Sequence, residues 1–177
     1  MMESALLSRA VHDRDVAAFA ALVRMHQDKV RGFLRRMTKG DAALADDLAQ
    51  ETFLLAWKRI AQFRFEGSFT GWLFGIAYTC ALMELRKRKL ETLDDTDWII
   101  APETESAKHA KLDVEKALAR LSPQERGVLT LCHTFGFSHE EAAQILNAPL
   151  GTVKSHALRG REKMRTILRA WNPETTS

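Results

Sequence analysis

The sequence contains little cysteine, glycine or proline, and these shortages argue against several classes of protein. Its 177 residues include 2 Cys, 9 Gly and 4 Pro. Cys80 and Cys132 lie far apart without CxxC spacing, so neither a disulfide framework nor a zinc site is indicated. Both lie in apolar patterns, where a buried reduced thiol is the ordinary state. The glycines punctuate helices and form no phosphate-binding loop.

Long apolar runs and a strong charge of one sign are also missing. No run approaches the roughly 20 residues of a membrane span. The first residues, MMESALLSRAVHDRD, turn polar at the third position, unlike a secretory signal. We therefore expect a cytosolic protein without membrane insertion. The net charge is only +3, so any nucleic-acid surface must come from local basic patches.

Helical periodicity dominates the chain, and no convincing alternating strand is present. The pattern predicts one helix over residues 15–37 and a second over 42–63 behind the N-cap Asp41. A third helix is expected from the N-cap Ser68 to residue 89. Further on, SPQE at 122–125 and SHEE at 138–141 both match the capping box, which predicts two closely spaced helix starts.

The helical segments fall into two groups. Between them, residues 91–106 read ETLDDTDWIIAPETES, which is acidic and has no sustained period. Such a segment is longer than most loops within a domain. We therefore expect an all-α fold: two small helical domains, residues 1–90 and 112–172, joined by a flexible acidic linker at 91–111.

The second domain contains the pattern of a helix-turn-helix. Only NAPL separates SHEEAAQIL from GTVKSHALRGREK. Ala143 is small where two helices would cross, and Asn147 tolerates the left-handed conformation at a helix end. Pro149 stops the first helix from continuing. The second helix of this motif can enter a DNA major groove.

The periodicity of that second helix separates an inward face from a basic edge. The inward face comprises Val153, Ala157, Gly160, Met164 and Leu168. The edge pointing elsewhere comprises Thr152, Lys154, Ser155, Leu158, Arg159 and Arg161. A solvated helix would explain a basic run alone. In the setting of a capped helix and a turn, we interpret this edge as a DNA-binding surface.

The predicted helix over 42–63 is two-sided. Its buried stripe comprises Ala49, Phe53, Ala56, Ile60 and Phe63. The opposite side carries Asp47, Glu51, Leu54 and Lys58, with Gln50 at its border. An exposed leucine alone is ordinary, and acids near a helix start suit the macrodipole. Together these residues could equally form a docking surface for a basic partner, with an apolar anchor at its centre.

The predicted third helix begins with aromatic residues and ends with basic ones. A core role is the default for its aromatics, and Arg86–Lys89 could simply complement a helix C-terminus. Rings beside a Gly/Ser loop also suit unpaired DNA, because bases stack on them while cations follow the backbone. For Phe65 and Phe69 the two alternatives stay open.

Three stretches resemble the extracytoplasmic-function group of bacterial sigma factors. They are ADDLAQETFLLAWKRIAQFR, GSFTGWLFGIAYTCALMELRKRK and LSPQERGVLTLCHTFGFSHEEAAQILNAPLGTVKSHALRGREKMR. The resemblance covers nearly the whole chain, about residues 15–168. It implies a two-domain subunit that joins core RNA polymerase and directs it to promoter DNA, without a cofactor or metal. A helix-turn-helix is shared by many regulators, whereas the segment DDLAQETFLLAW is specific to this group.

The resemblance also implies roles for individual residues. Asp47, Gln50, Glu51 and Leu54 would bind the clamp helices of the polymerase's largest subunit. The minus-ten element would be opened by Phe65, Ser68, Phe69, Trp72, Thr79, Arg86 and Arg88. The minus-thirty-five element would be contacted by Thr152, Lys154, Ser155, Leu158, Arg159 and Arg161. The acidic linker resembles the segment that passes through the polymerase interior, and an anti-sigma factor is the partner that typically inhibits this group.

Four positions depart from the family pattern. Thr79 stands where Asn is common, and Met83 where Asp is common, which puts base choice at the minus-ten element in doubt. His156 replaces a usual arginine. Gly160 replaces a usual alanine, at about 0.5–1 kcal/mol of helix stability unless close packing requires it.

Three other classes of protein compete with this interpretation. A free-standing helix-turn-helix regulator would need a dimerisation or ligand domain, and the first domain has neither a heptad seam nor a glycine-rich loop. An adaptor that binds polymerase without DNA is also conceivable. An enzyme is the least favoured, because HEEAA at His139 lacks the second histidine of HExxH. A helix would also point Cys132 and His133 about 100° apart.

Overall fold

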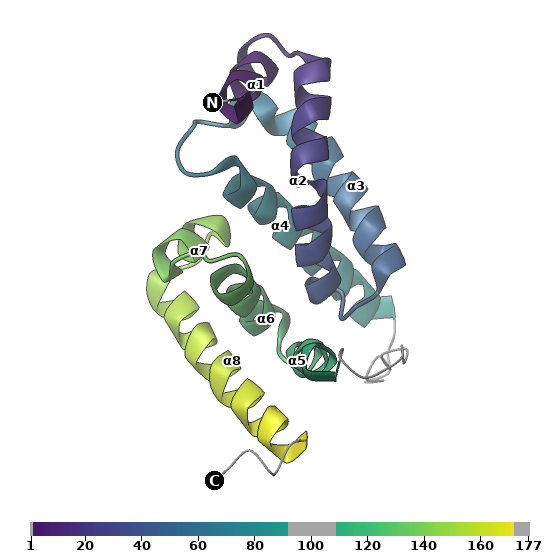
Figure 1. Ribbon diagram of the computed structural model, residues 1–177, viewed down its shortest axis with the longest axis vertical. Coiled ribbons are helices and arrows are strands. Elements are labelled where there is room, and N and C mark those ends of the chain that lie inside the picture. The colour runs from purple at the N-terminus through teal and green to yellow at the C-terminus, as the bar shows by residue number, and fades with distance from the viewer. Residues whose placement is uncertain (1, 92–108, 172–177) are drawn as a thin grey trace.

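The computed structural model describes residues 2–91 and 109–171, which form helices and no strand (Figure 1). The first half contains α1 (Met2–His12), α2 (Val16–Met37), α3 (Ala42–Arg59), the 3₁₀ turn η1 (Ile60–Gln62) and α4 (Phe69–Glu91). The second half contains α5 (His109–Ala119), α6 (Pro123–Leu129), the π-helical turn η2 (Thr130–Thr134), α7 (His139–Ile145) and α8 (Leu150–Trp171). The predicted all-α class is confirmed.

The predicted helix starts in the first half are confirmed by their caps. The Asp15 carboxylate accepts a hydrogen bond from the Ala18 N–H at 3.0 Å, and Asp41 does the same for Leu44. Ser68 Oγ accepts from the Gly71 N–H at 3.0 Å. These side chains satisfy N–H groups that the first turn of a helix leaves without partners.

Helix α1 was not predicted. It is short, but Leu6, Leu7, Ala10 and Val11 recur at helical spacing and pack against the core. The expected linker at 91–111 falls mainly on residues 92–108, which lie outside the described part of the chain. At its margins, Glu91 is the last residue of α4 and residues 109–111 begin α5.

The turn features of the second half follow the prediction. Both capping boxes, at Ser122 and Ser138, are complete. Asn147 has a φ of 48°, the left-handed conformation expected of it. Ala142 of α7 is fully buried, and Ala143 is half-buried and packs against the same core.

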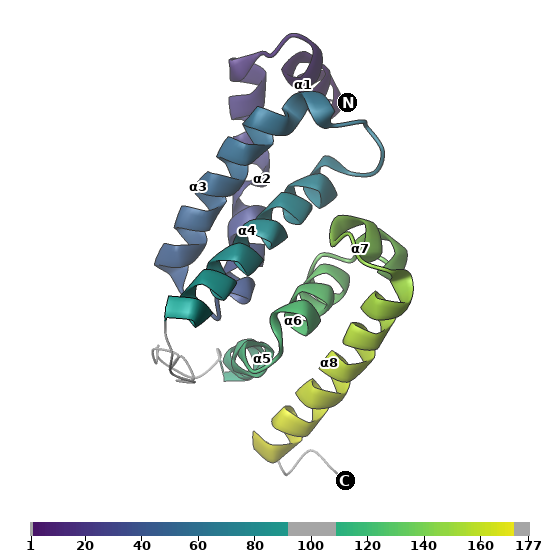
Figure 2. The same ribbon diagram turned by 180° about the vertical axis from the view of Figure 1, so that it is seen from behind.

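The two halves pack against each other and share one hydrophobic core (Figure 2). The Phe135 ring lies 4.6 Å from Phe74 of α4, measured between ring centroids, and 6.5 Å from Phe33 of α2. Gly75 makes room for α7, because a Cβ there would lie 2.9 Å from the Ile145 carbonyl oxygen. The sequence indicated two modules on a tether, and these apolar contacts between distant segments were not foreseen.

A buried arginine links the halves. Arg126 of α6 is 1% exposed, and its guanidinium donates to the carbonyl of Met37 at 2.6 Å. It also donates to three carbonyls around the end of α5, those of Leu118, Ala119 and Leu121. Burial lowers the pKa of Arg126 to about 10, so it remains charged at neutral pH. The charge is thus satisfied by helix-end carbonyls, which carry partial negative charge.

Candidate functional site

One face of α3 carries the predicted docking residues. Asp47, Gln50, Glu51 and Leu54 are all exposed, and Leu54 exposes 64% of its surface. The opposite face is buried through Leu44, Ala45, Leu48, Ala49, Thr52 and Ala56. Asp46, at the margin, is 3.3 Å from the Arg31 guanidinium of α2. The amphipathic pattern thus places an apolar side chain among acids on the solvent side, as predicted.

The loop before α4 is built on an aromatic cluster. Phe63 is buried at its centre, with ring centroids at 5.1 Å from Phe65 and 5.5 Å from each of Phe69 and Trp72. Phe69 is only 3% exposed, which fits the core alternative and not direct base contact. Phe65 is 46% exposed and has a φ of 59°. A bulky residue rarely adopts this conformation, which costs about 1–3 kcal/mol.

The remaining residues of α4 predicted to contact the minus-ten element differ in their exposure and in the contacts they already make. Thr79 and Arg86 are exposed, and Trp72 is half-buried. The Thr79 hydroxyl donates to the Gly75 carbonyl at 3.0 Å. Ser68 is exposed but serves as the N-cap described above. Arg88 is already engaged in ion pairs, with Glu84 at 2.8 Å and Asp41 at 3.9 Å, which makes it a structural link.

Helix α8 presents the predicted edge to solvent. Thr152, Lys154, Ser155, Leu158, Arg159 and Arg161 are all exposed. Val153, Ala157 and Gly160 are buried and Met164 and Leu168 half-buried, as the periodicity predicted. Gly160 has a packing reason: a Cβ there would lie 3.0 Å from Leu129 Cδ1. The glycine therefore lets α8 approach α6 closely.

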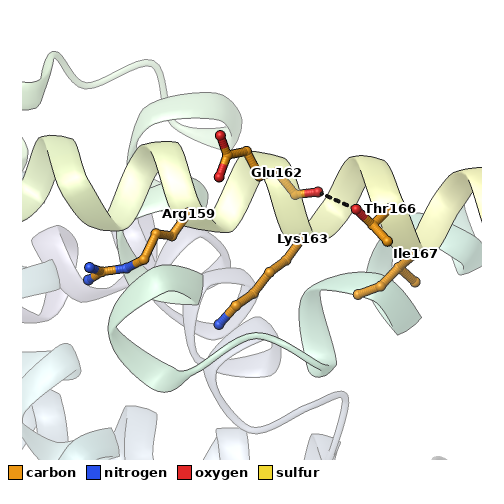
Figure 3. Close-up of a pocket in the computed structure, with 5 residues that line it drawn as sticks. All are labelled: Arg159, Glu162, Lys163, Thr166 and Ile167. Atoms are coloured by element: carbon orange, nitrogen blue, oxygen red, sulfur yellow. Dashed lines mark hydrogen bonds between the residues drawn. The ribbon is translucent and has the colours of Figure 1, made fainter.

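Glu125 anchors α8, although the sequence predicted only its place in the capping box at Ser122. Glu125 of α6 is 3% exposed, and Lys163 Nζ donates to both its carboxylate oxygens at 2.9 Å. Arg159 Nε lies 3.8 Å from the same carboxylate. Figure 3 shows Arg159 and Lys163 extending to the same side of α8. With Glu162, Thr166 and Ile167 they line a shallow hollow of about 320 Å³. Burial raises the pKa of Glu125, but hydrogen bonds from Lys163 and Ser122 outweigh burial and lower it overall.

Two family models match this chain, one for each half. The model for sigma-70 region 2 matches residues 22–91, and the model for sigma-70 region 4 matches residues 111–164. The ECF RNA polymerase sigma factor EcfG of Rhodopseudomonas palustris is 35% identical, and the match covers 73% of this chain and 74% of that protein. The chain belongs to the ECF group of RNA polymerase sigma factors.

Other relatives agree with this assignment. The ECF sigma factor SigE of Mycolicibacterium smegmatis is 35% identical. The match covers 87% of this chain and 63% of the length of that relative. The RNA polymerase sigma-H factor of Pseudomonas aeruginosa is 30% identical, with 92% of both chains covered.

Solved structures share the fold. The sigma factor RpoE in complex with the anti-sigma factor NepR from Bartonella quintana has a TM-score of 0.73 and 28% identity, covering 87% of this chain and 98% of that one. CnrH in complex with the cytosolic domain of CnrY has a TM-score of 0.71 at 24% identity, covering 96% and 99%, which supports the fold alone.

The structure shows the surroundings of the residues at which this sigma factor departs from its family. Met83 is 64% exposed on α4, near Thr79 on the same side of the helix. His156 is half-buried, and its Nδ1 lies 3.1 Å from Arg159 Nη2. Because guanidinium nitrogens only donate, the imidazole accepts in this pair. Burial and the charge of Arg159 lower the pKa of His156, which agrees with a neutral ring.

Cys80 is buried and Cys132 half-buried, and both are free thiols. Burial raises the pKa of both, which favours the protonated form. Among the described residues, no three His, Cys, Asp or Glu side chains gather as metal ligands would. No helix in the described ranges is both long and apolar enough to cross a membrane.

Proposed function

We propose that this sigma factor binds core RNA polymerase through the exposed face of α3 and directs it to promoters from the cytoplasm. The clamp helices of the largest subunit would meet Asp47, Gln50, Glu51 and Leu54. The observation that carries this proposal is their common exposure on one helix face, with Leu54 uncovered among acids. An apolar anchor within complementary charge suits a docking surface.

The two other surfaces would act on DNA. Phe65 and the start of α4 would hold opened strand at the minus-ten element, since exposed rings stack on unpaired bases. The exposed edge of α8 would read the minus-thirty-five element in the major groove. Each surface contributes few contacts, so both bind usefully only when polymerase holds them on the same promoter.

An anti-sigma factor is the expected inhibitory partner. The RpoE relative from Bartonella quintana was solved in complex with the anti-sigma factor NepR, and the match covers 98% of that chain. We extend this class of partner to the present chain on that similarity.

Co-purification with core polymerase tests the docking surface. Glu51→Lys should weaken association at least about tenfold, since like charges facing each other across an interface cost several kcal/mol. Asp28→Lys is the matched control, because Asp28 is an exposed acid on α2. Equal binding by both variants would contradict the α3 assignment, and failure of the parent chain to bind would favour a free-standing regulator.

Run-off transcription with start-site mapping tests the α8 surface. Arg159→Ala should reduce promoter-specific initiation at least about fivefold, because one lost base or phosphate contact costs about 1–3 kcal/mol. Arg165→Ala is the control, since Arg165 is exposed on the same helix outside the predicted edge. Polymerase binding should be unchanged in both, and its loss with Arg159→Ala would overturn this division of roles.

A further inference from the structure

Helix α1, which has no assigned role, meets the proposed minus-ten loop at one end and, through His26 of α2, the start of α4 at the other. Near its start, Glu3 Oε1 lies 3.2 Å from Nε2 of the buried His26, without ideal hydrogen-bond geometry. His26 Nδ1 in turn lies 3.2 Å from the Thr70 hydroxyl in the first turn of α4. At the other end of α1, the His12 ring faces Phe65. The helix therefore bridges the loop and the helix that follows it.

The facing rings have the geometry of a stacking site. The His12 and Phe65 ring centroids are 6.0 Å apart, and the planes are inclined by only 12°. Both residues are exposed, whereas Phe63 and Phe69 are buried in the cluster beneath. Rings that only fill a core need no access to solvent. Rings that bind a ligand with a flat π-face must be reachable from solvent.

Both rings are held in place by the surrounding chain. His12 Nδ1 lies 2.9 Å from the Ser8 carbonyl oxygen, which can only accept, so this nitrogen donates. Phe65 tilts against Phe63 at 5.1 Å and keeps a φ of 59°. A strained aromatic held outward is typical of functional positions. The exposed Arg64 precedes it, so a cation is next to the ring in the sequence.

We propose that His12 and Phe65 form a two-ring site that holds one unpaired nucleobase of the opened promoter strand. The base enters between the rings, which must move apart to give stacking on both faces. This inference rests on the proposed minus-ten role of the loop and adds a residue from α1 to it. Stacking tolerates any base, so the site contributes affinity for opened strand more than base choice.

The test uses the complex of this sigma factor with core polymerase. The probe is a forked DNA made from a promoter mapped by run-off transcription, with its minus-ten strand unpaired. His12→Ala should weaken fork binding at least about fivefold, the lower end of the range for one lost base–ring stack. His12→Phe keeps a ring and should stay within about twofold of the parent chain. His133→Ala, which removes an exposed histidine in the second half, should change nothing.

The two hypotheses fail in different ways. If Phe65→Ala weakens fork binding while His12→Ala does not, the loop keeps its role and the two-ring site is wrong. If neither variant matters while polymerase binding is intact, the role of the loop is wrong as well. Tighter binding by His12→Ala would overturn the two-ring site, because the histidine would then compete with the base for Phe65. A loss by His12→Phe equal to that of His12→Ala, or a parallel loss of polymerase binding, would also overturn the site.

Discussion

At the residue scale, His26 shows how one buried polar side chain ties three helices together. It lies on α2, is 3% exposed, and meets Thr70 of α4 and Glu3 of α1. Its ring also meets Phe69 edge-on, with centroids 5.3 Å apart. Burial lowers the pKa of His26, although the Glu3 carboxylate opposes this effect. The folded chain therefore favours the neutral ring.

This environment predicts a pH dependence of stability. The pKa of His26 is lower in the folded chain than in the unfolded chain, where it is near the ordinary 6.5. The unfolded state thus binds more protons below about pH 6.5, and the free energy of unfolding should fall as the pH drops from 7.5 to 5. Urea unfolding at several pH values should show a smaller drop for His26→Gln than for the parent chain. Equal drops in both would contradict the assignment.

At the element scale, the contact between α8 and α6 depends on the lack of a side chain at Gly160. The contact sets the orientation of the edge that we propose reads DNA, with Lys163 and Glu125 forming an ion pair beside it at 2.9 Å. A glycine within a helix ordinarily lowers stability by about 0.8–1 kcal/mol relative to alanine. At Gly160 the close contact with Leu129 of α6 explains why a glycine is present despite this loss of helix stability.

Two glycines of α8 provide a matched pair for testing this contact. Gly160→Ala would place its Cβ 3.0 Å from Leu129, whereas a Cβ at Gly151 meets nothing within 4 Å. We expect Gly151→Ala to be the more stable variant by about 1–2 kcal/mol, because overpacking offsets the gain in helix propensity. Thermal unfolding of both variants measures the difference. Equal stability would mean that Leu129 moves aside without cost.

The elements that the sequence predicted are those whose signals are local. Asp15, Asp41 and Ser68 cap helices within three residues of themselves, so a short window contains the whole interaction. The faces of α3 and α8 follow from periodicity alone, which placed every proposed residue of both surfaces on the solvent side. Helix α1 carries a shorter form of the same signal, because Leu6, Leu7, Ala10 and Val11 mark its core side within only 11 residues.

At the scale of the whole molecule, the relation between the two halves could not be predicted. Arg126 and the Met37 carbonyl are 89 residues apart in sequence, and Gly75 meets α7 about 70 positions further along. The Arg36 guanidinium also pairs with Glu115 across the halves at 2.8 Å. No local pattern encodes such partners, since many arginines and glycines of the chain would look equivalent. The exposed His12 and Phe65 meet in the same non-local way.

Enlarging Gly75 should separate the halves. A Cβ at this position would lie 2.9 Å from the Ile145 backbone oxygen, so Gly75→Leu must displace α7 from α4. We expect a larger radius of gyration in X-ray scattering, with helical content by circular dichroism unchanged. Gly32→Leu is the control, because a Cβ there meets nothing within 4 Å. A folded Gly75→Leu variant with the parent's radius would refute this account of the interface.

The hydrogen bond from Arg126 to the Met37 carbonyl has a consequence for how affinity is measured. Promoter elements centred about 25 base pairs apart lie about 85 Å apart along straight duplex DNA. A single chain that reads both must release the 2.6 Å contact that joins its halves. The dissociation constant observed for promoter DNA in the polymerase complex is then the intrinsic constant divided by the fraction of chains already parted. Variants that loosen the junction without touching either proposed DNA surface would seem to bind the promoter more tightly.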